Sequence, residues 1–138
     1  MKTIFFVAIL STTTMFSAQS QIINKSFIAQ IGTVCEETSE PNPCAGYNIY
    51  LLLNFEKEYV TIIEKNIRTC KTEDTKFHLK TKWILNKNRE VIFPDRDKLK
   101  NTFVENLSLK VINNTLIGYK PDWKKKIQEY KFEINRAK

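Results

Sequence analysis

Hydrophobic and polar residues alternate along most of the chain from Phe27 onward, a pattern typical of β-strands with one buried and one exposed face. The alternation is clearest near the end, where Tyr130, Phe132 and Ile134 are separated by Glu or Lys. This spacing predicts an antiparallel strand with one face in the core. Eight segments with such patterns are the expected strands: 27–34, 47–55, 59–65, 77–85, 90–93, 107–112, 115–120 and 127–134.

Turn-forming residues separate these segments. The Asn113-Asn114 pair favours a two-residue type I′ hairpin, because Asn adopts positive φ at little cost. The NKNR segment at 86–89 is expected to form a similar turn, and residues 56–58 are expected to join another hairpin. The expected strands are therefore connected mostly to their neighbours along the chain.

One segment, PDRDKLKNTFVEN, does not alternate. It offers Asp95 and Asp97 as candidate helix caps, and it places Leu99 and Phe103 four residues apart, as on one face of a helix. We expect a short helix or a lid-like loop near residues 95–105.

The expected fold is all-β. Short strands joined by hairpins leave exposed edges unless the sheet closes on itself, so a single antiparallel meander of about eight strands closed into a small barrel is the first expectation. A two-sheet β-sandwich has the same strand count with a different connection order and is the alternative.

Residues 1–20 have the composition of a secretory signal peptide. Lys2 is followed by an apolar run and then by small residues, and cleavage after Ser20 satisfies the small-x-small preference. No later run has the length or apolar character of a membrane span. The expectation is one β-barrel domain at 21–138, secreted or periplasmic.

Positive charge is concentrated in the last third of the chain. The formal net charge is +7, and from residue 98 onward ten Lys or Arg face four Asp or Glu. The segment YKPDWKKKI places Trp123 beside Lys124, Lys125 and Lys126, which are the candidate partner-binding residues. Such a patch attracts nucleic acid, anionic lipid or an acidic protein, or it is a solvated face. Export argues against nucleic acid.

Three cysteines allow at most one internal disulfide, which export permits. Pairing of Cys35 with Cys44 is favoured slightly, because the first would end one strand and the second would precede the next. Cys70 is the alternative partner, because it follows a third strand and could pair equally well if that strand lies beside the first.

No motif points to catalysis, a metal or a cofactor. The chain has one histidine, His78, which lies between lysines on the polar side of its strand and has no nucleophile or acid in a recognisable pattern. The cysteines lack zinc spacing, and no phosphate-binding or dinucleotide-binding motif occurs. A non-catalytic protein without metal or cofactor is expected.

Aromatic side chains are the candidate ligand contacts. Tyr50, Trp83, Tyr119 and Trp123 lie on or beside expected strands, where rings with polar tips would line a pocket if the barrel interior is not filled. The alternative is that the aromatic residues form the core.

Several segments together resemble the small lipocalin-like (calycin) domains of secreted bacterial proteins. They are an early strand with Gly32 and Cys35, the hairpin YNIYLLLNFEKEYVTII, the strand FHLKTKWIL with its return EVIF, and the closing hairpin LSLKVINNTLIGY followed by EYKFEI. Lipocalins carry Gly-x-Trp on the first strand, where this chain has Val34 after Gly32-Thr33. The resemblance implies an up-and-down barrel that binds a small apolar ligand without catalysis.

The first functional hypothesis is therefore a secreted protein that binds a small hydrophobic or amphipathic ligand in a barrel. It requires a cavity of at least about 300 Å³. The second is a protein-interaction module, such as an inhibitor or surface partner, that presents the basic C-terminal hairpin to an acidic protein.

Overall fold

The computed structural model describes Gln19 and residues 21–136, so the expected signal peptide lies almost wholly outside the described residues. Residues 21–136 form nine strands and two short 3-10 helices. These are β1 (Ser26–Val34), β2 (Tyr47–Phe55), β3 (Tyr59–Arg68), β4 (Glu73–Lys82), β5 (Ile84–Leu85), β6 (Glu90–Ile92), η1 (Arg96–Leu99), η2 (Phe103–Asn106), β7 (Ser108–Ile112), β8 (Thr115–Pro121) and β9 (Ile127–Ile134).

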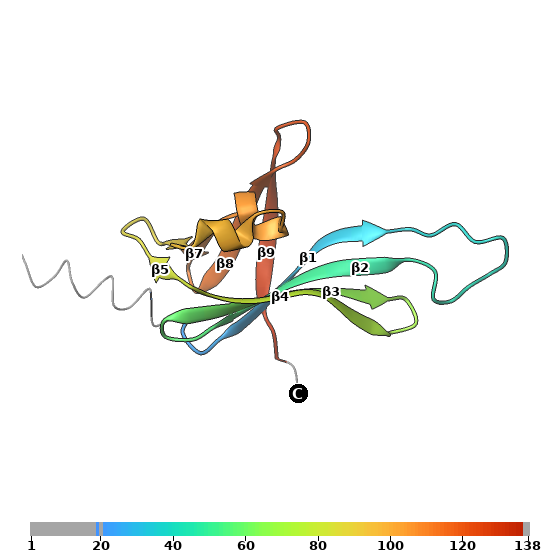
Figure 1. Cartoon of the computed structure of the whole chain (residues 1–138), viewed down its shortest axis with the longest axis horizontal. Coiled ribbons are helices and arrows are strands. Elements are labelled where there is room, and N and C mark those ends of the chain that lie inside the picture. Colours follow the sequence, from blue (N-terminus) through green and yellow to red (C-terminus); the bar gives the residue numbers. More distant parts are fainter. Residues whose placement is uncertain (1–18, 20, 137–138) are drawn as a thin grey trace, which may run out of the picture.

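The strands form one antiparallel sheet that curls into a nearly closed barrel (Figure 1). Their order in the sheet is β4-β3-β2-β1-β9-β8-β7-β6-β5, so almost every pair of neighbours is consecutive in the chain. The exception is β1 with β9, which are joined by two residue pairs. The meander expected from the sequence is confirmed, and the connection order favours the barrel over the sandwich.

Local turn chemistry explains the hairpins. Both Asn113 and Asn114 have positive φ, 47° and 64°, as a type I′ turn requires, and Ile112 pairs with Thr115 across them. The β2–β3 turn closes through a hydrogen bond from the Glu56 N–H to the Tyr59 carbonyl, 2.7 Å. These two predicted turns are confirmed.

The expected strand at 77–85 is divided at Trp83. Its backbone N–H donates to the Glu58 carbonyl at 3.2 Å, and its Nε1–H donates to the Glu56 carbonyl at 2.9 Å. Because both groups bond to the β2–β3 turn, the strand ladder stops here and resumes as β5 on the opposite edge of the sheet. One residue therefore carries the chain from one edge of the sheet to the other.

The barrel interior is filled by side chains. Phe55 packs edge-to-face against both Phe27 and Trp83, with ring centroids 6.0 and 5.0 Å apart. Leu53, Ile62 and many other apolar residues complete the core. All core residues within the described part of the chain lie between positions 22 and 132, so residues 21–138 contain the packed interior.

The segment near 95–105, expected as a short helix or a lid-like loop, forms the two short 3-10 helices η1 and η2. Asp95 occupies the N-cap position of η1 as expected, but its carboxylate forms no cap hydrogen bond and pairs with Lys98 at 3.1 Å. Asp97 lies within η1 and pairs with Lys100 at 2.8 Å, so its expected role as a cap is wrong. Leu99 anchors the segment to the barrel, and it is buried.

Replacing Trp83 tests the closure of the barrel. Trp83→Leu removes ring contacts and the bond to the Glu56 carbonyl, so we expect the free energy of unfolding to fall by about 3 kcal/mol. Ile84→Ala is the matched control, because the adjacent side chain is 53% exposed, and its effect should stay within about 0.5 kcal/mol. Urea unfolding measures both, and equal losses for the two variants would contradict this role.

Candidate functional site

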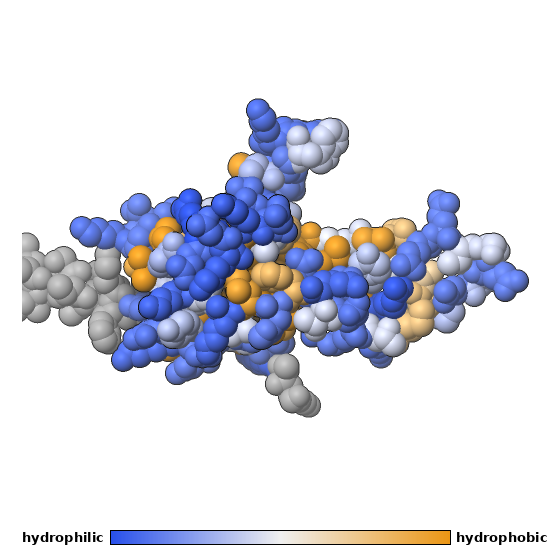
Figure 2. Space-filling view, in the orientation of Figure 1, coloured by the Kyte–Doolittle hydropathy of each residue, from blue (hydrophilic) through white to orange (hydrophobic). Residues whose placement is uncertain are grey.

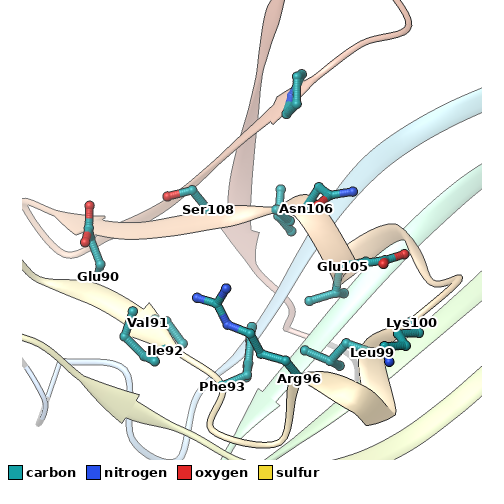
Figure 3. Close-up of a pocket in the computed structure, with 13 residues that line it drawn as sticks. Glu90, Val91, Ile92, Phe93, Arg96, Leu99, Lys100, Glu105, Asn106 and Ser108 are labelled. Carbon is teal, nitrogen blue, oxygen red and sulfur yellow. The ribbon is translucent and has the colours of Figure 1, made fainter. Parts of the chain in front are cut away.

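A pocket of about 600 Å³ lies where β6 and β7 separate (Figure 3). The two strands share only two residue pairs, Glu90 with Lys110 and Val91 with Leu109. Beyond these pairs the strands diverge, and η1 and η2 span the space between their ends. The pocket therefore opens through the wall of the barrel and does not occupy its interior.

The floor of this pocket is apolar. It is formed by residues that belong at the same time to the hydrophobic core: Val91, Phe93, Leu99, Val104 and Leu107. Two of them come from the η1–η2 segment, which the short 3-10 helices hold against the barrel. These side chains are already packed in the core, so an apolar group of a ligand would contact an ordered apolar surface.

The rim of the pocket is polar and carries four charged residues. Glu90 Oε2 accepts a hydrogen bond from Asn86 Nδ2 at 2.9 Å, and Glu105 Oε2 accepts one from the Asn101 N–H at 2.9 Å. Lys100 pairs with Asp97. Three of the four charges thus have partners within the protein.

Arg96 is the fourth charge on the rim. Its side chain lies across the gap between the diverging strands, with the guanidinium directed toward the Ser108 side of the pocket (Figure 3). Within the described residues the guanidinium forms no hydrogen bond or ion pair. The pocket therefore offers a cation whose donors are free for a ligand.

Lys120 fixes η2 from the neighbouring strand β8. Its ammonium donates to the Phe103 carbonyl and lies 4.5 Å from the centre of the Phe103 ring. Burial lowers the pKa of the Lys120 ammonium. On its other side Phe103 packs edge-to-face on Tyr130 at 5.2 Å. These contacts hold the segment that supplies Val104 and Glu105 to the pocket.

The structure does not gather the four aromatic residues expected to bind a ligand. Trp83 is 2% exposed and belongs to the filled core, which corrects the expectation of a cavity inside the barrel. Tyr50 lies on β2 opposite Lys65, and Tyr119 lies on β8 opposite Ser108 and Glu129. Trp123 lies in the β8–β9 turn, and none of the four lines the pocket.

The lysines expected to bind a partner follow Trp123 in the β8–β9 turn. Lys124, Lys125 and Lys126 are all exposed. His78 is exposed on β4 opposite Ile63. Among Gln19 and residues 21–136, no three His, Cys, Asp or Glu side chains are arranged to hold a metal ion, and no helix there is long and apolar enough to cross a membrane.

Sequence reasoning missed the pocket-lining set. The signal that pointed toward it was the non-alternating segment, which was expected as a short helix or lid and which contributes Arg96, Leu99 and Val104. Nothing in the sequence pattern distinguished Arg96 from the other charged residues of this segment.

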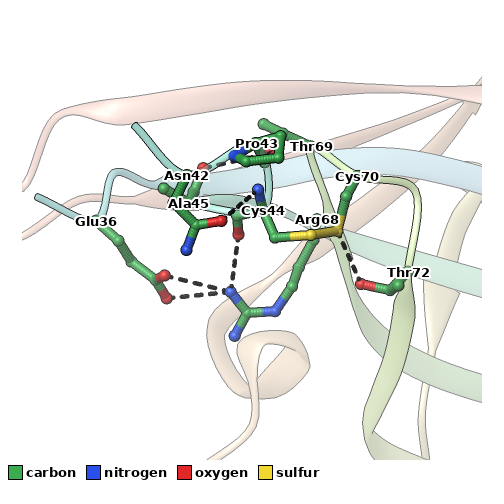
Figure 4. Close-up of polar contacts among 9 residues, drawn as sticks. All are labelled: Glu36, Asn42, Pro43, Cys44, Ala45, Arg68, Thr69, Cys70 and Thr72. Atoms are coloured by element: carbon green, nitrogen blue, oxygen red, sulfur yellow. Dashed lines mark hydrogen bonds and ion pairs between the residues drawn. A yellow bond between two sulfur atoms is a disulfide. The ribbon is translucent and has the colours of Figure 1, made fainter. Parts of the chain in front are cut away.

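The cysteine pairing favoured from the sequence is wrong, because the disulfide joins Cys44 to Cys70, the alternative partner (Figure 4). Cys35 is left free and exposed. The cause is the length of the β2–β3 ladder, which extends to Tyr47 opposite Arg68. The residues just before β2 and just after β3 therefore meet, with the Cα atoms of the bridged cysteines 4.8 Å apart.

Polar contacts hold the segment around the disulfide. Arg68 donates to the Cys44 carbonyl at 3.2 Å and to the Glu36 carboxylate at 3.3 Å, while Thr69 donates to the Ala45 carbonyl at 3.2 Å (Figure 4). Gly46 has a φ of +80°, and a Cβ there would lie 2.8 Å from the Val34 carbonyl oxygen. Close approach of β1 to this turn thus requires glycine.

Comparisons of the chain with protein-family models, with curated proteins and with solved structures gave no match. The structure shows the barrel-shaped sheet. Membership of the lipocalin-like family stays a prediction.

Replacing both bridged cysteines tests the disulfide. The bridge spans a sequence separation of 26 residues, so Cys44→Ser with Cys70→Ser should lower the free energy of unfolding by about 3–4 kcal/mol. Cys35→Ser should leave the unfolding midpoint unchanged. Alkylation of the denatured, unreduced protein should label Cys35 alone, and a label on Cys70 would show that another pair forms.

Proposed function

We propose that this protein is a non-catalytic binding protein that holds a small amphipathic molecule with an anionic group in the pocket between β6 and β7. The observation that carries the proposal is the Arg96 guanidinium, which has no partner among the described residues and lies above an apolar floor. The apolar part of the ligand would lie on the floor, and its anionic group would meet Arg96.

The size and composition of the pocket support this proposal. Its volume of about 600 Å³ falls within the range of about 300–1,000 Å³ that is typical of small-molecule sites. Such sites combine an apolar surface with a few polar groups that fix orientation. Leu107 and Phe93 supply apolar surface, while Asn106 and Ser108 add polar groups on the rim.

The hydrogen bonds at the rim distinguish Arg96 from the other three charged residues. Glu90 and Glu105 each accept one hydrogen bond from an asparagine, and Lys100 pairs with Asp97. Arg96 keeps all its donors, and a guanidinium fits a carboxylate through two parallel hydrogen bonds. A carboxylate on an apolar chain is the ligand chemistry that matches this arrangement.

The proposed function includes export, for which the disulfide is supporting evidence. Disulfides persist mainly in oxidising compartments, and the Cys44–Cys70 bridge joins the end of the β1–β2 connection to the β3–β4 turn. A binding protein outside the cytoplasm would agree with the expected signal peptide at 1–20 and with the lipocalin-like resemblance.

The proposal is tested by titrating residues 21–138 with the fluorescent anion anilinonaphthalene sulfonate and displacing it with dodecanoate. Arg96→Gln should weaken dodecanoate binding about 10- to 150-fold, because it removes charge-assisted hydrogen bonds worth about 1.5–3 kcal/mol. Ser108→Phe should weaken dodecanoate binding as well, since the ring would enter the pocket from the exposed rim.

Lys98→Gln is the matched control, because Lys98 lies on the same helix η1 but pairs with Asp95 and does not line the pocket. It should bind dodecanoate as the unchanged protein does. Dodecyltrimethylammonium has the same chain with the opposite charge and should compete poorly. Equal binding of both detergents, or no effect of Arg96→Gln and Ser108→Phe, would overturn the proposal.

A further inference from the structure

The turn between β8 and β9 projects from the body of the protein (Figures 1 and 2). At its tip Trp123 is 87% exposed, and Ile127 at the start of β9 is 63% exposed. Lys124, Lys125 and Lys126 lie between them and are exposed as well. Tryptophan, the largest apolar side chain, is highly buried on average, so its exposure beside three cations is unusual.

The tip has a defined conformation. Asp122 Oδ1 accepts hydrogen bonds from the N–H groups of Lys124 and Lys126 at 2.8 and 2.9 Å, and Asp122 Oδ2 accepts one from Gln128 at 3.1 Å. The Asp122 N–H also donates to the Lys126 carbonyl at 2.8 Å. Because the backbone is already ordered, presentation of Trp123 to a partner costs little further entropy.

The charge of the tip is not neutralised locally. Within the part of the chain that the structure describes, the ion pairs involve none of Lys124, Lys125 and Lys126. The one carboxylate at the tip, on Asp122, is occupied by backbone and amide donors. Lys124 lies 4.7 Å from the centre of the Trp123 ring, so cation and ring face outward together.

We propose that this tip, residues 122–127, docks on an anionic lipid surface. Tryptophan is enriched at the level of lipid headgroups, and lysines near a membrane are attracted by anionic lipids. A flat surface that approaches the projecting hairpin meets the tip first. The tip exposes one aromatic anchor and three cations, which is the combination that such a surface recognises.

The size of the tip favours a lipid surface over an acidic protein. A stable protein interface usually takes about 20–30 residues on each side, whereas the projecting tip offers six. A membrane needs no complementary outline, because headgroups rearrange around an inserted ring. The proposal rests on these residues alone and is independent of the ligand pocket.

The test uses residues 21–138, because the apolar leader would itself bind lipid. Vesicles of phosphatidylglycerol and phosphatidylcholine in equal parts are compared with vesicles of phosphatidylcholine alone, using sedimentation and tryptophan emission. The chain has two tryptophans, and Trp83 is 2% exposed, so a blue shift on binding should come from Trp123. We expect binding to the anionic vesicles only, with loss at about 1 M salt.

Replacing Lys124, Lys125 and Lys126 together by alanine should lower the partition coefficient about 100-fold, since each lysine near an anionic surface contributes about fivefold. Trp123→Ala should abolish the blue shift and weaken binding. The control for charge replaces Lys57, Lys82 and Lys87 by alanine, because these exposed lysines lie in the β2–β3 turn, at the end of β4 and in the β5–β6 turn. The control for apolar exposure is Ile84→Ala.

Two results would overturn the proposal. An equal loss in the two triple-lysine variants would show that overall charge, and not the tip, causes binding. No binding to anionic vesicles at low salt would exclude the lipid surface and would leave an acidic protein as the partner that the three lysines fit. Unchanged unfolding midpoints in all variants establish that the differences arise at the surface.

Discussion

Closure of the sheet at Trp83 is the constraint on which the rest of the structure depends. β4 and β5 are consecutive in the chain but lie at opposite ends of the hydrogen-bonded order, so the sheet has to curl until its two edges meet at this residue. The Trp83 indole fixes the point where the chain passes from β4 to β5, because it packs on Phe55 and donates a hydrogen bond to the Glu56 carbonyl. The ring fills the interior at this point, and the pocket that the structure describes lies in the wall.

The pocket arises because the strands that follow Trp83 are short. β5 has two residues and β6 has three, so β6 pairs with β7 over a short distance before the chains diverge. The η1–η2 segment closes the wide end, and Pro121 at the end of β8 contributes to the rim. The projecting hairpin therefore begins at the rim of the pocket. The two proposed sites are therefore adjacent.

The antiparallel meander and several of its turns could be predicted from the sequence, whereas the pairing of particular residues from distant segments could not. The turn at Asn113-Asn114 and the strand at 127–134 depend on neighbouring residues and were predicted correctly. The pairing of Cys44 with Cys70 depends on how far the β2–β3 ladder extends, which residue patterns do not specify. In the same way, Arg96 became a site residue only because β6 and β7 diverge.

The order of the strands also has a consequence for how the chain folds. Five of the eight pairs of neighbouring strands, namely β2–β3, β3–β4, β5–β6, β7–β8 and β8–β9, are joined by turns of at most five residues, so their contacts form at small loop-closure cost. The pairing of Phe27 with Ile134 is different, because it joins the two ends of the domain through a ladder of two residue pairs. Contacts within these hairpins therefore cost little chain entropy, whereas the pairing of β1 with β9 carries the largest loop-closure cost in the sheet.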